Sequence, residues 1–210
     1  MRVVVVGACA LSLDQSAHAA PLTFRFTGTV DGMLDPAARP APWDAIAIGD
    51  PWTLTYTFET TTPDTQSSPN LGTYDGAILS YSLIVGPVSR NTLSFGEIYI
   101  YDEEPGDFDQ YELHIFPPGS NPIYLFQLDD STGSSWNSDA LPTSLNLNGF
   151  DSATDLRIIC NGNSWNIRGP VQSFAVIPEP SVTFALLTVL TRVAIGRRSR
   201  TRVNSSALSI

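Results

Sequence analysis

Five carboxylates lie within residues 102–109, near the middle of this 210-residue chain, and four of them are candidate ligands of a metal ion: Asp102, Glu104, Asp107 and Asp109. Gly106 allows the backbone to bend sharply between them. Hard cations such as Ca²⁺ take roughly six to eight oxygen ligands, and carbonyls of a bent loop can complete such a set. The spacing lacks the framework of an EF-hand. A solvated hairpin turn, whose charges discourage edge pairing, is the alternative interpretation.

A second acidic pair, Asp129-Asp130, ends a later predicted strand. It would enlarge the candidate Ca²⁺ site only if the fold brings the two turns together, and the spacing in sequence does not decide this.

Catalytic chemistry has few candidate residues. His114 is the only histidine after the first 18 residues, and strand periodicity places it on the face of Glu112 and Phe116. The motifs of serine hydrolases and of nucleotide-binding loops are missing from the sequence. Glycosidases need only two suitably separated carboxylates. We therefore predict a non-catalytic domain, with a secreted hydrolase using residues such as Glu104 or Asp109 as the less favoured alternative.

Aromatic residues give a third candidate chemistry. Trp43, Trp136 and Trp165 fall in or beside predicted loops. Exposed aromatic rings can stack on the flat faces of sugar rings, so Trp136 and Trp165 are candidate ligand-binding residues of a carbohydrate-binding module. Its partner would be a polysaccharide, and Ca²⁺ would assist binding in one version of this hypothesis. Tryptophans that cap the ends of a hydrophobic core give the same pattern.

The elements that must position these residues are β-strands. In residues 52–58, Trp52, Leu54, Tyr56 and Phe58 alternate with threonines, which is typical of a half-buried strand. Related patterns predict strands at residues 22–30, 52–58, 77–85, 92–101, 110–116, 123–128, 154–160 and 164–177, and short ones at 45–48 and 144–148. Gly169-Pro170 is expected to break the last long strand into two. About nine strands with frequent turns indicate an all-β domain, an antiparallel β-sandwich of jelly-roll or Greek-key type.

The charge distribution excludes one class of partner. Acidic residues number 21 against 11 basic ones, and lysine is absent. Between Pro21 and Ile177 lie 19 of the acids and only five arginines. A domain this acidic has no basic face for nucleic-acid phosphates. Cys160 is the only cysteine of this region, so the domain has no internal disulfide.

The N-terminus resembles a secretory signal peptide. Arg2 precedes a mostly apolar stretch over residues 3–13, and Ala17-His18-Ala19 matches an A-x-A cleavage site. Cleavage would follow Ala19, so we predict a signal segment at 1–19 and an exported domain at 20–177. A lipidation site at Cys9 is an alternative, although few residues precede it.

The C-terminus has three parts in a fixed order. Pro178-Glu179-Pro180 is followed by Ser181, a suitable helix N-cap. Residues 182–195 form an apolar run of 14 residues interrupted by Arg192, and the run ends in a basic cluster of Arg197, Arg198 and Arg200. As a helix the run spans about 21 Å, which is shorter than the roughly 30 Å of a hydrocarbon core. The arginines behind it suit the cytoplasmic side.

This order of parts resembles the PEP-CTERM sorting signal of exported bacterial proteins, on Pro178, Glu179, Pro180, Ser181 and the arginine cluster. The resemblance implies export, a transient membrane anchor formed by a C-terminal hydrophobic helix, and processing by an exosortase. It places the sorting segment at 178–202. Residues 203–210 trail beyond this pattern, and we expect them to be a disordered tail. The expected product is a protein of the cell envelope, cell surface or extracellular matrix.

Overall fold

The computed structural model describes residues 21–35, 39–102, 108–119, 122–160 and 165–178. These residues form an antiparallel β structure without an α-helix in the described ranges. The strands are β1 (Leu22–Thr29), β2 (Gly32–Leu34), β3 (Pro51–Phe58), β4 (Leu71–Asp75), β5 (Ile78–Val85), β6 (Val88–Arg90), β7 (Phe95–Asp102), β8 (Asp109–Phe116), β9 (Ile123–Asp130), β10 (Ser152–Cys160) and β11 (Trp165–Ile177). The all-β prediction is confirmed.

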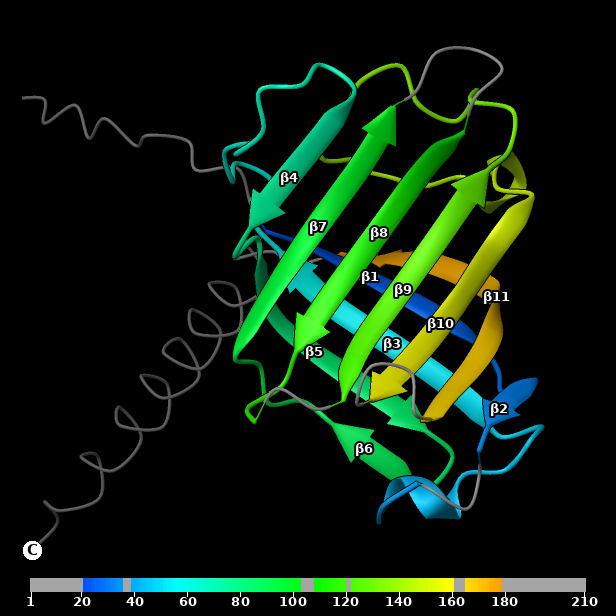
Figure 1. The fold of residues 1–210 in the computed structure, drawn as a ribbon. Coiled ribbons are helices and arrows are strands. Elements are labelled where there is room, and N and C mark those ends of the chain that lie inside the picture. Colours follow the sequence, from blue (N-terminus) through cyan, green and yellow to red (C-terminus); the bar gives the residue numbers. More distant parts are fainter. Residues whose placement is uncertain (1–20, 36–38, 103–107, 120–121, 161–164, 179–210) are drawn as a thin grey trace, which may run out of the picture.

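All the strands belong to one curled sheet with the order β4-β7-β8-β9-β10-β11-β1-β3-β5-β6, while β2 pairs with β11. We call β4, β7, β8, β9 and β10 the front half, and β1, β3, β5 and β6 the back half. In Figure 1 strands β7 to β10 of the front half, in green and yellow, cross in front of β1, β3 and β5. Five of the ten strand pairs join strands that are consecutive in sequence, namely β5–β6, β7–β8, β8–β9, β9–β10 and β10–β11, as antiparallel pairing allows.

The corner between the two halves is made by β11. Its first part pairs with β10, ending at Pro170 opposite Asp155, and its second part pairs with β1 from Val171 onward. Gly169 lies at this change of partner, where an added Cβ would be 2.3 Å from the Thr29 carbonyl oxygen. The sequence predicts a break at Gly169-Pro170, and the structure instead shows one strand that changes partner there.

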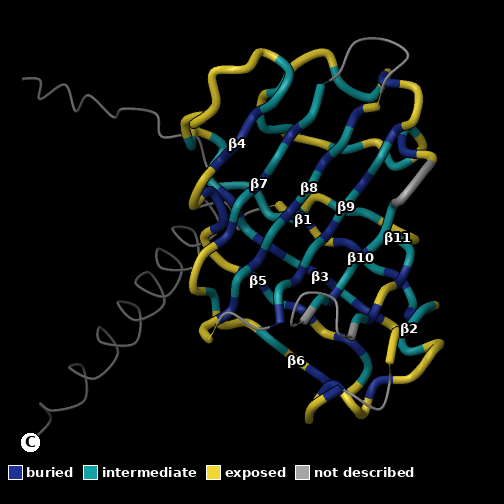
Figure 2. The backbone as a smooth tube through the Cα atoms, in the orientation of Figure 1, coloured by how far each residue is buried: buried dark blue, intermediate teal, exposed yellow. Residues whose placement is uncertain are grey.

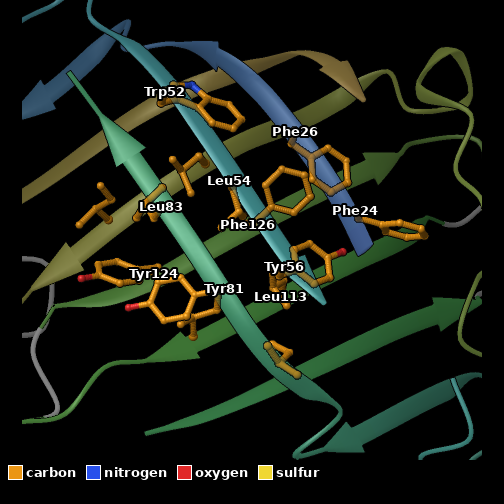
Figure 3. Close-up of a cluster of buried hydrophobic side chains, with 14 of the residues drawn as sticks. Phe24, Phe26, Trp52, Leu54, Tyr56, Tyr81, Leu83, Leu113, Tyr124 and Phe126 are labelled. Carbon is orange, nitrogen blue, oxygen red and sulfur yellow. The ribbon is translucent and has the colours of Figure 1, made fainter. Parts of the chain in front are cut away.

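The hydrophobic core lies between the two halves. Along most of β1, β3, β7, β8 and β9 every second residue is buried, which gives the alternating pattern in Figure 2. Large rings fill the space, and Figure 3 shows Phe26 of β1 beside Phe126 of β9, with ring centroids 4.2 Å apart. The Tyr56 and Tyr111 hydroxyls hydrogen-bond to each other in the core. Burial raises the pKa of both phenols, so each stays protonated.

The eight long predicted strands are confirmed, with end shifts of a few residues. The two short ones, at 45–48 and 144–148, are wrong. Trp43–Ala45 forms a 3₁₀ turn, and the buried Arg39 donates to the carbonyls of Trp43 and Ile46 at 3.0 and 3.2 Å, so a side chain takes the place of a neighbouring strand. Leu147–Gly149 is a second 3₁₀ turn, started by the Asn146 side chain.

Three short strands, β2, β4 and β6, are not predicted from the sequence. They comprise 3, 5 and 3 residues, and β4 and β6 are the two edges of the sheet. A strand this short has too few residues for its alternation to show in the sequence, and it forms because a longer neighbour offers hydrogen-bond partners.

In the described ranges no helix has the length and apolarity to cross a membrane. Most of the sorting segment, including Glu179, Pro180, Ser181 and the arginine cluster, falls outside these ranges, as do Ala17 and Ala19 of the predicted leader. Pro178 is described and is exposed directly after β11.

Candidate functional site on the outward face of the front half

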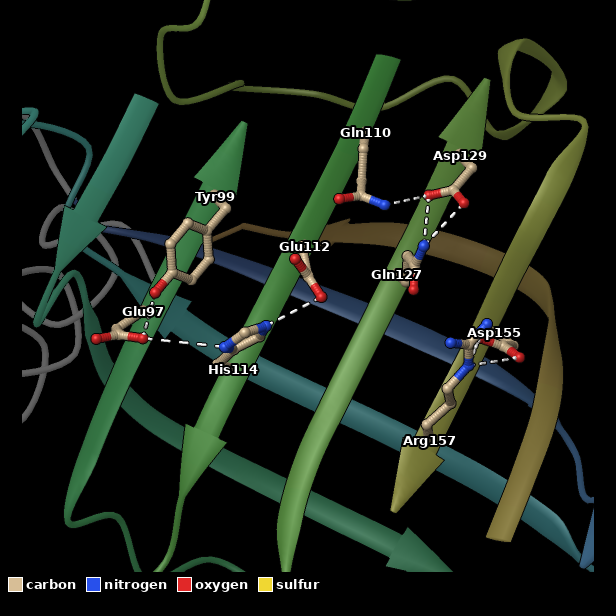
Figure 4. Close-up of polar contacts among 9 residues, drawn as sticks. All are labelled: Glu97, Tyr99, Gln110, Glu112, His114, Gln127, Asp129, Asp155 and Arg157. Atoms are coloured by element: carbon tan, nitrogen blue, oxygen red, sulfur yellow. Dashed lines mark hydrogen bonds and ion pairs between the residues drawn. The ribbon is translucent and has the colours of Figure 1, made fainter. Parts of the chain in front are cut away.

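The outward face of the front half carries ionisable and amide side chains in neighbouring rows. Strand alternation turns every second residue of β7 to β10 away from the core. Figure 4 shows the outward side chains that contact one another, namely Glu97, Tyr99, Gln110, Glu112, His114, Gln127, Asp129, Asp155 and Arg157. All of them remain partly accessible to solvent.

A chain of contacts joins two carboxylates across β7 and β8. His114 Nε2 lies 3.0 Å from Glu112 Oε1, and His114 Nδ1 lies 3.9 Å from Glu97 Oε2. The Tyr99 hydroxyl donates to Glu97 Oε2 at 2.7 Å. Burial and this hydrogen bond raise the pKa of Tyr99, so the phenol remains a donor. The predicted position of His114 beside Glu112 is confirmed.

Amide side chains continue the polar surface across β8 and β9. Gln110 Nε2 donates to Asp129 Oδ1 at 2.9 Å, and Gln127 Nε2 donates to both carboxylate oxygens at 2.9 and 2.8 Å. On β10 Arg157 Nε lies 2.9 Å from Asp155 Oδ1. Burial raises the pKa of Asp155 despite the neighbouring guanidinium, which acts in the opposite direction.

Aromatic rings flank Glu97 and Glu112 in three ring contacts along the β7–β8 hairpin. Phe95 contacts Phe116 at one end with ring centroids 6.0 Å apart, and Tyr101 contacts Phe108 at the other end at 6.3 Å. Tyr99 and His114 lie between them at 4.9 Å. We call these six rings the aromatic strip. Phe95 and Phe108 are 41% and 40% exposed, so the strip is accessible at both ends.

The acidic turn is only partly described. Asp102 and Asp109 lie directly opposite each other on β7 and β8, while Glu104 and Asp107 fall outside the described residues. Burial, together with the charges of Asp109 and Asp139, raises the pKa of Asp102. Among the described residues no three His, Cys, Asp or Glu side chains are grouped closely enough to hold a metal ion.

Asp109 and Asp130 organise the neighbouring loop. Both are buried, and they are register partners on β8 and β9, so the second acidic pair does lie beside the first turn. Asp109 Oδ2 accepts the Trp136 backbone N–H at 2.8 Å. Asp130 accepts from the backbone and hydroxyl groups of Thr132 and Ser134 at 2.7 to 3.1 Å. Burial opposes ionisation of Asp130, but these bonds outweigh it and lower its pKa.

The tryptophans occupy different environments. Trp43 is buried in the core, with the Arg90 guanidinium 5.3 Å from its ring centroid. Trp136 packs against Phe150 at 5.5 Å and lines a cavity of about 300 Å³. Trp165 begins β11, and its side chain lies outside what the structure describes. Trp43 and Trp136 therefore both pack on the core.

The aromatic strip is missed by the sequence analysis. Its signal is present in β7, where Phe95, Glu97, Tyr99 and Tyr101 occupy alternate positions. That alternation predicts a strand, but it does not by itself tell the outward row from the inward one, because Ile98 and Ile100 make an equally apolar second row.

Comparisons with models of known protein families, with curated proteins and with solved structures found no match.

Proposed function

We propose that this chain is an exported, non-catalytic surface or extracellular-matrix protein that an exosortase processes at its PEP-CTERM-like segment. The sequence supports this proposal through the order Pro178-Glu179-Pro180, apolar run, arginine cluster. The observation that carries it is the position of the last described strand: β11 ends at Ile177, directly before Pro178. In this proposal the β-domain is the part that is delivered.

The pairing of the terminal strands supports the same arrangement. Thr23 of β1 is the register partner of Ile177 of β11. A leader removed after Ala19 and an anchor that begins at Pro178 would thus both join the domain at one place. The domain could be held briefly at the membrane through its C-terminal segment without threading a strand through the sheet.

We further propose that the curled sheet is a two-layered β-sandwich. The support is that aromatic side chains of both halves meet in one core. From β3 to β7 the chain changes halves three times: β4 pairs with β7 in the front half, β5 returns to pair with β3 in the back half, and β7 lies in the front half again. Such crossings are what a jelly-roll or Greek-key arrangement requires.

The proposed non-catalytic role has a competitor in the carboxylate-dependent hydrolase. One of its candidate residues, Asp109, is fully buried and accepts the Trp136 backbone N–H, which suits a structural role. The other, Glu104, lies outside the described residues.

Sorting is tested by expressing the full chain in a host with an exosortase and in the same host without it. We expect a shortened, surface-bound or released protein only where the enzyme is present, measured by cell fractionation and intact mass. Glu179→Ala together with Pro180→Ala should leave the protein uncut in the membrane fraction. Ser205→Ala, beyond the sorting segment, is the control. Equal processing of all variants, or processing without the enzyme, would contradict the proposal.

A further inference from the structure

We propose that the aromatic strip and its two carboxylates, Glu97 and Glu112, form a binding site for an extended, neutral polysaccharide. This proposal goes beyond the sorting function and does not depend on it, since the site is built from the outward residues of the β7–β8 hairpin alone. Trp136 and Trp165, the residues that the sequence suggests for sugar binding, take no part in it.

The dimensions of the strip suit a polymer. Phe95 and Tyr101 are six residues apart on β7, which at about 3.4 Å per residue is a distance of roughly 20 Å. Rings at both ends and in the middle of this distance offer flat apolar surfaces to consecutive units of a ligand. An extended chain of sugar rings presents such flat C–H faces repeatedly, whereas a small molecule would contact only one ring pair.

The polar groups between the rings accept hydrogen bonds. Within the described part of the chain, Glu97 Oε1 and Glu112 Oε2 have no hydrogen-bond partner, while the other oxygen of each carboxylate contacts His114. An ionised carboxylate can only accept. The matching ligand therefore carries donors around the edges of flat rings, and hydroxyl groups of a sugar meet this requirement.

Charge decides which class of polysaccharide fits. The outward face of β7 to β10 carries Glu97, Glu112, Asp129 and Asp155, whereas its arginine, Arg157, is already paired with Asp155. An anionic polymer would be repelled by this face and by the strongly acidic domain. A basic peptide would satisfy the carboxylates, but Glu97 and Glu112 are recessed, at 18% and 16% side-chain exposure, between rings that a flat ligand covers better.

Affinity electrophoresis of the full chain tests the site. Native gels containing hydroxyethyl cellulose or glucomannan are compared with gels containing alginate, an anionic polymer. We expect retardation in at least one neutral gel, none in alginate, and no effect of a chelator. Phe95→Ser combined with Phe108→Ser should weaken the apparent affinity about tenfold, because the stacking surfaces at both ends are lost. Glu112→Gln should also weaken the apparent affinity for the polymer, because an amide replaces the charged carboxylate acceptor.

The matched control is Ile84→Ser. Ile84 is 46% exposed on β5, in the back half of the sheet. The substitution therefore removes an exposed apolar side chain that does not belong to the aromatic strip. Its retardation should equal that of the wild type, and thermal melting should confirm that every variant is folded. Mobility unchanged by either neutral polymer overturns the proposal, as does retardation that survives the double phenylalanine variant. Binding of oligolysine in place of polysaccharide would assign the face to a basic partner, and loss of retardation with chelator would assign it to a bridging cation.

Discussion

The two halves of the sheet share one core but have different outward faces. On the back half the outward positions of β1 and β3 are mostly threonine, and Thr23 and Thr57 hydrogen-bond through their hydroxyls at 2.8 Å. The charged side chain among these positions is Arg25. The front half instead presents carboxylates, amides, a histidine and aromatic rings.

Threonine is what the fold alone favours on such a face, because β-branched residues suit a pleated, half-buried surface. Acidic residues are depleted in strands, and like charges on neighbouring strands destabilise them. The front half therefore carries outward residues that its own folding does not require. The difference supports the proposal that the front face binds a ligand, whereas the residues of the back face are those that a pleated, half-buried surface favours.

The largest expected effect comes from Asp130 of the front half, whose ionised carboxylate holds a loop, compared with an uncharged threonine of the back half. Asp130→Asn should lower the free energy of unfolding by about 2–4 kcal/mol, because an amide cannot accept all four bonds that the carboxylate accepts. Thr55→Val on the back face should change it by less than about 0.5 kcal/mol. Both are measured by urea unfolding.

The pH dependence gives the same test a second readout. Because the folded-state pKa of Asp130 is lowered, its contribution is present above the unfolded pKa of about 3.9 and is lost as the pH falls through the lower folded value. The difference between wild type and Asp130→Asn should thus shrink in strong acid. A difference that is constant down to low pH would show that ionisation of Asp130 does not matter.

An intermediate effect concerns the polar contact that joins the halves. Tyr111→Phe should cost about 1–3 kcal/mol, because the Tyr56 hydroxyl is then buried without its partner. Tyr56→Phe combined with Tyr111→Phe should recover part of this loss. If calorimetry shows the two single changes to be additive in the double variant, the hydroxyls do not support one another.

The smallest expected effect is a gain. Asp102→Asn should raise the free energy of unfolding at pH 7 by about 0.2–1 kcal/mol, since it relieves repulsion from Asp109 directly opposite. The pKa of Asp102 is raised in the folded protein, so the gain should vanish at a pH below the unfolded value. Thermal melting at several pH values measures it.

Millimolar Ca²⁺ should stabilise the wild type more than this variant if the acidic turn binds calcium.

The sequence predicts the long strands because burial of one face imposes a period of two, as in Trp52 to Phe58. It does not predict the 3₁₀ turn at Trp43, because the partner of that backbone is the guanidinium of Arg39, a side-chain contact that the periodicity of the sequence does not reveal. The candidate site is harder still. Asp109 and Trp136 are candidates by residue type alone, but the fold buries the Asp109 carboxylate and packs the Trp136 indole against Phe150. The accessible polar and aromatic groups belong instead to outward residues such as Glu97 and Tyr99, whose alternation in the sequence predicts only a strand.

The corner strand also has a mechanical consequence. β11 is bonded to β10 of the front half and to β1 of the back half, and it leads directly into Pro178. A force between an anchored tail and a ligand on β7 would cross the ladders of β8, β9 and β10 before reaching β11. Each of these ladders has six or more register pairs, whereas the edge strand β6 is held by three.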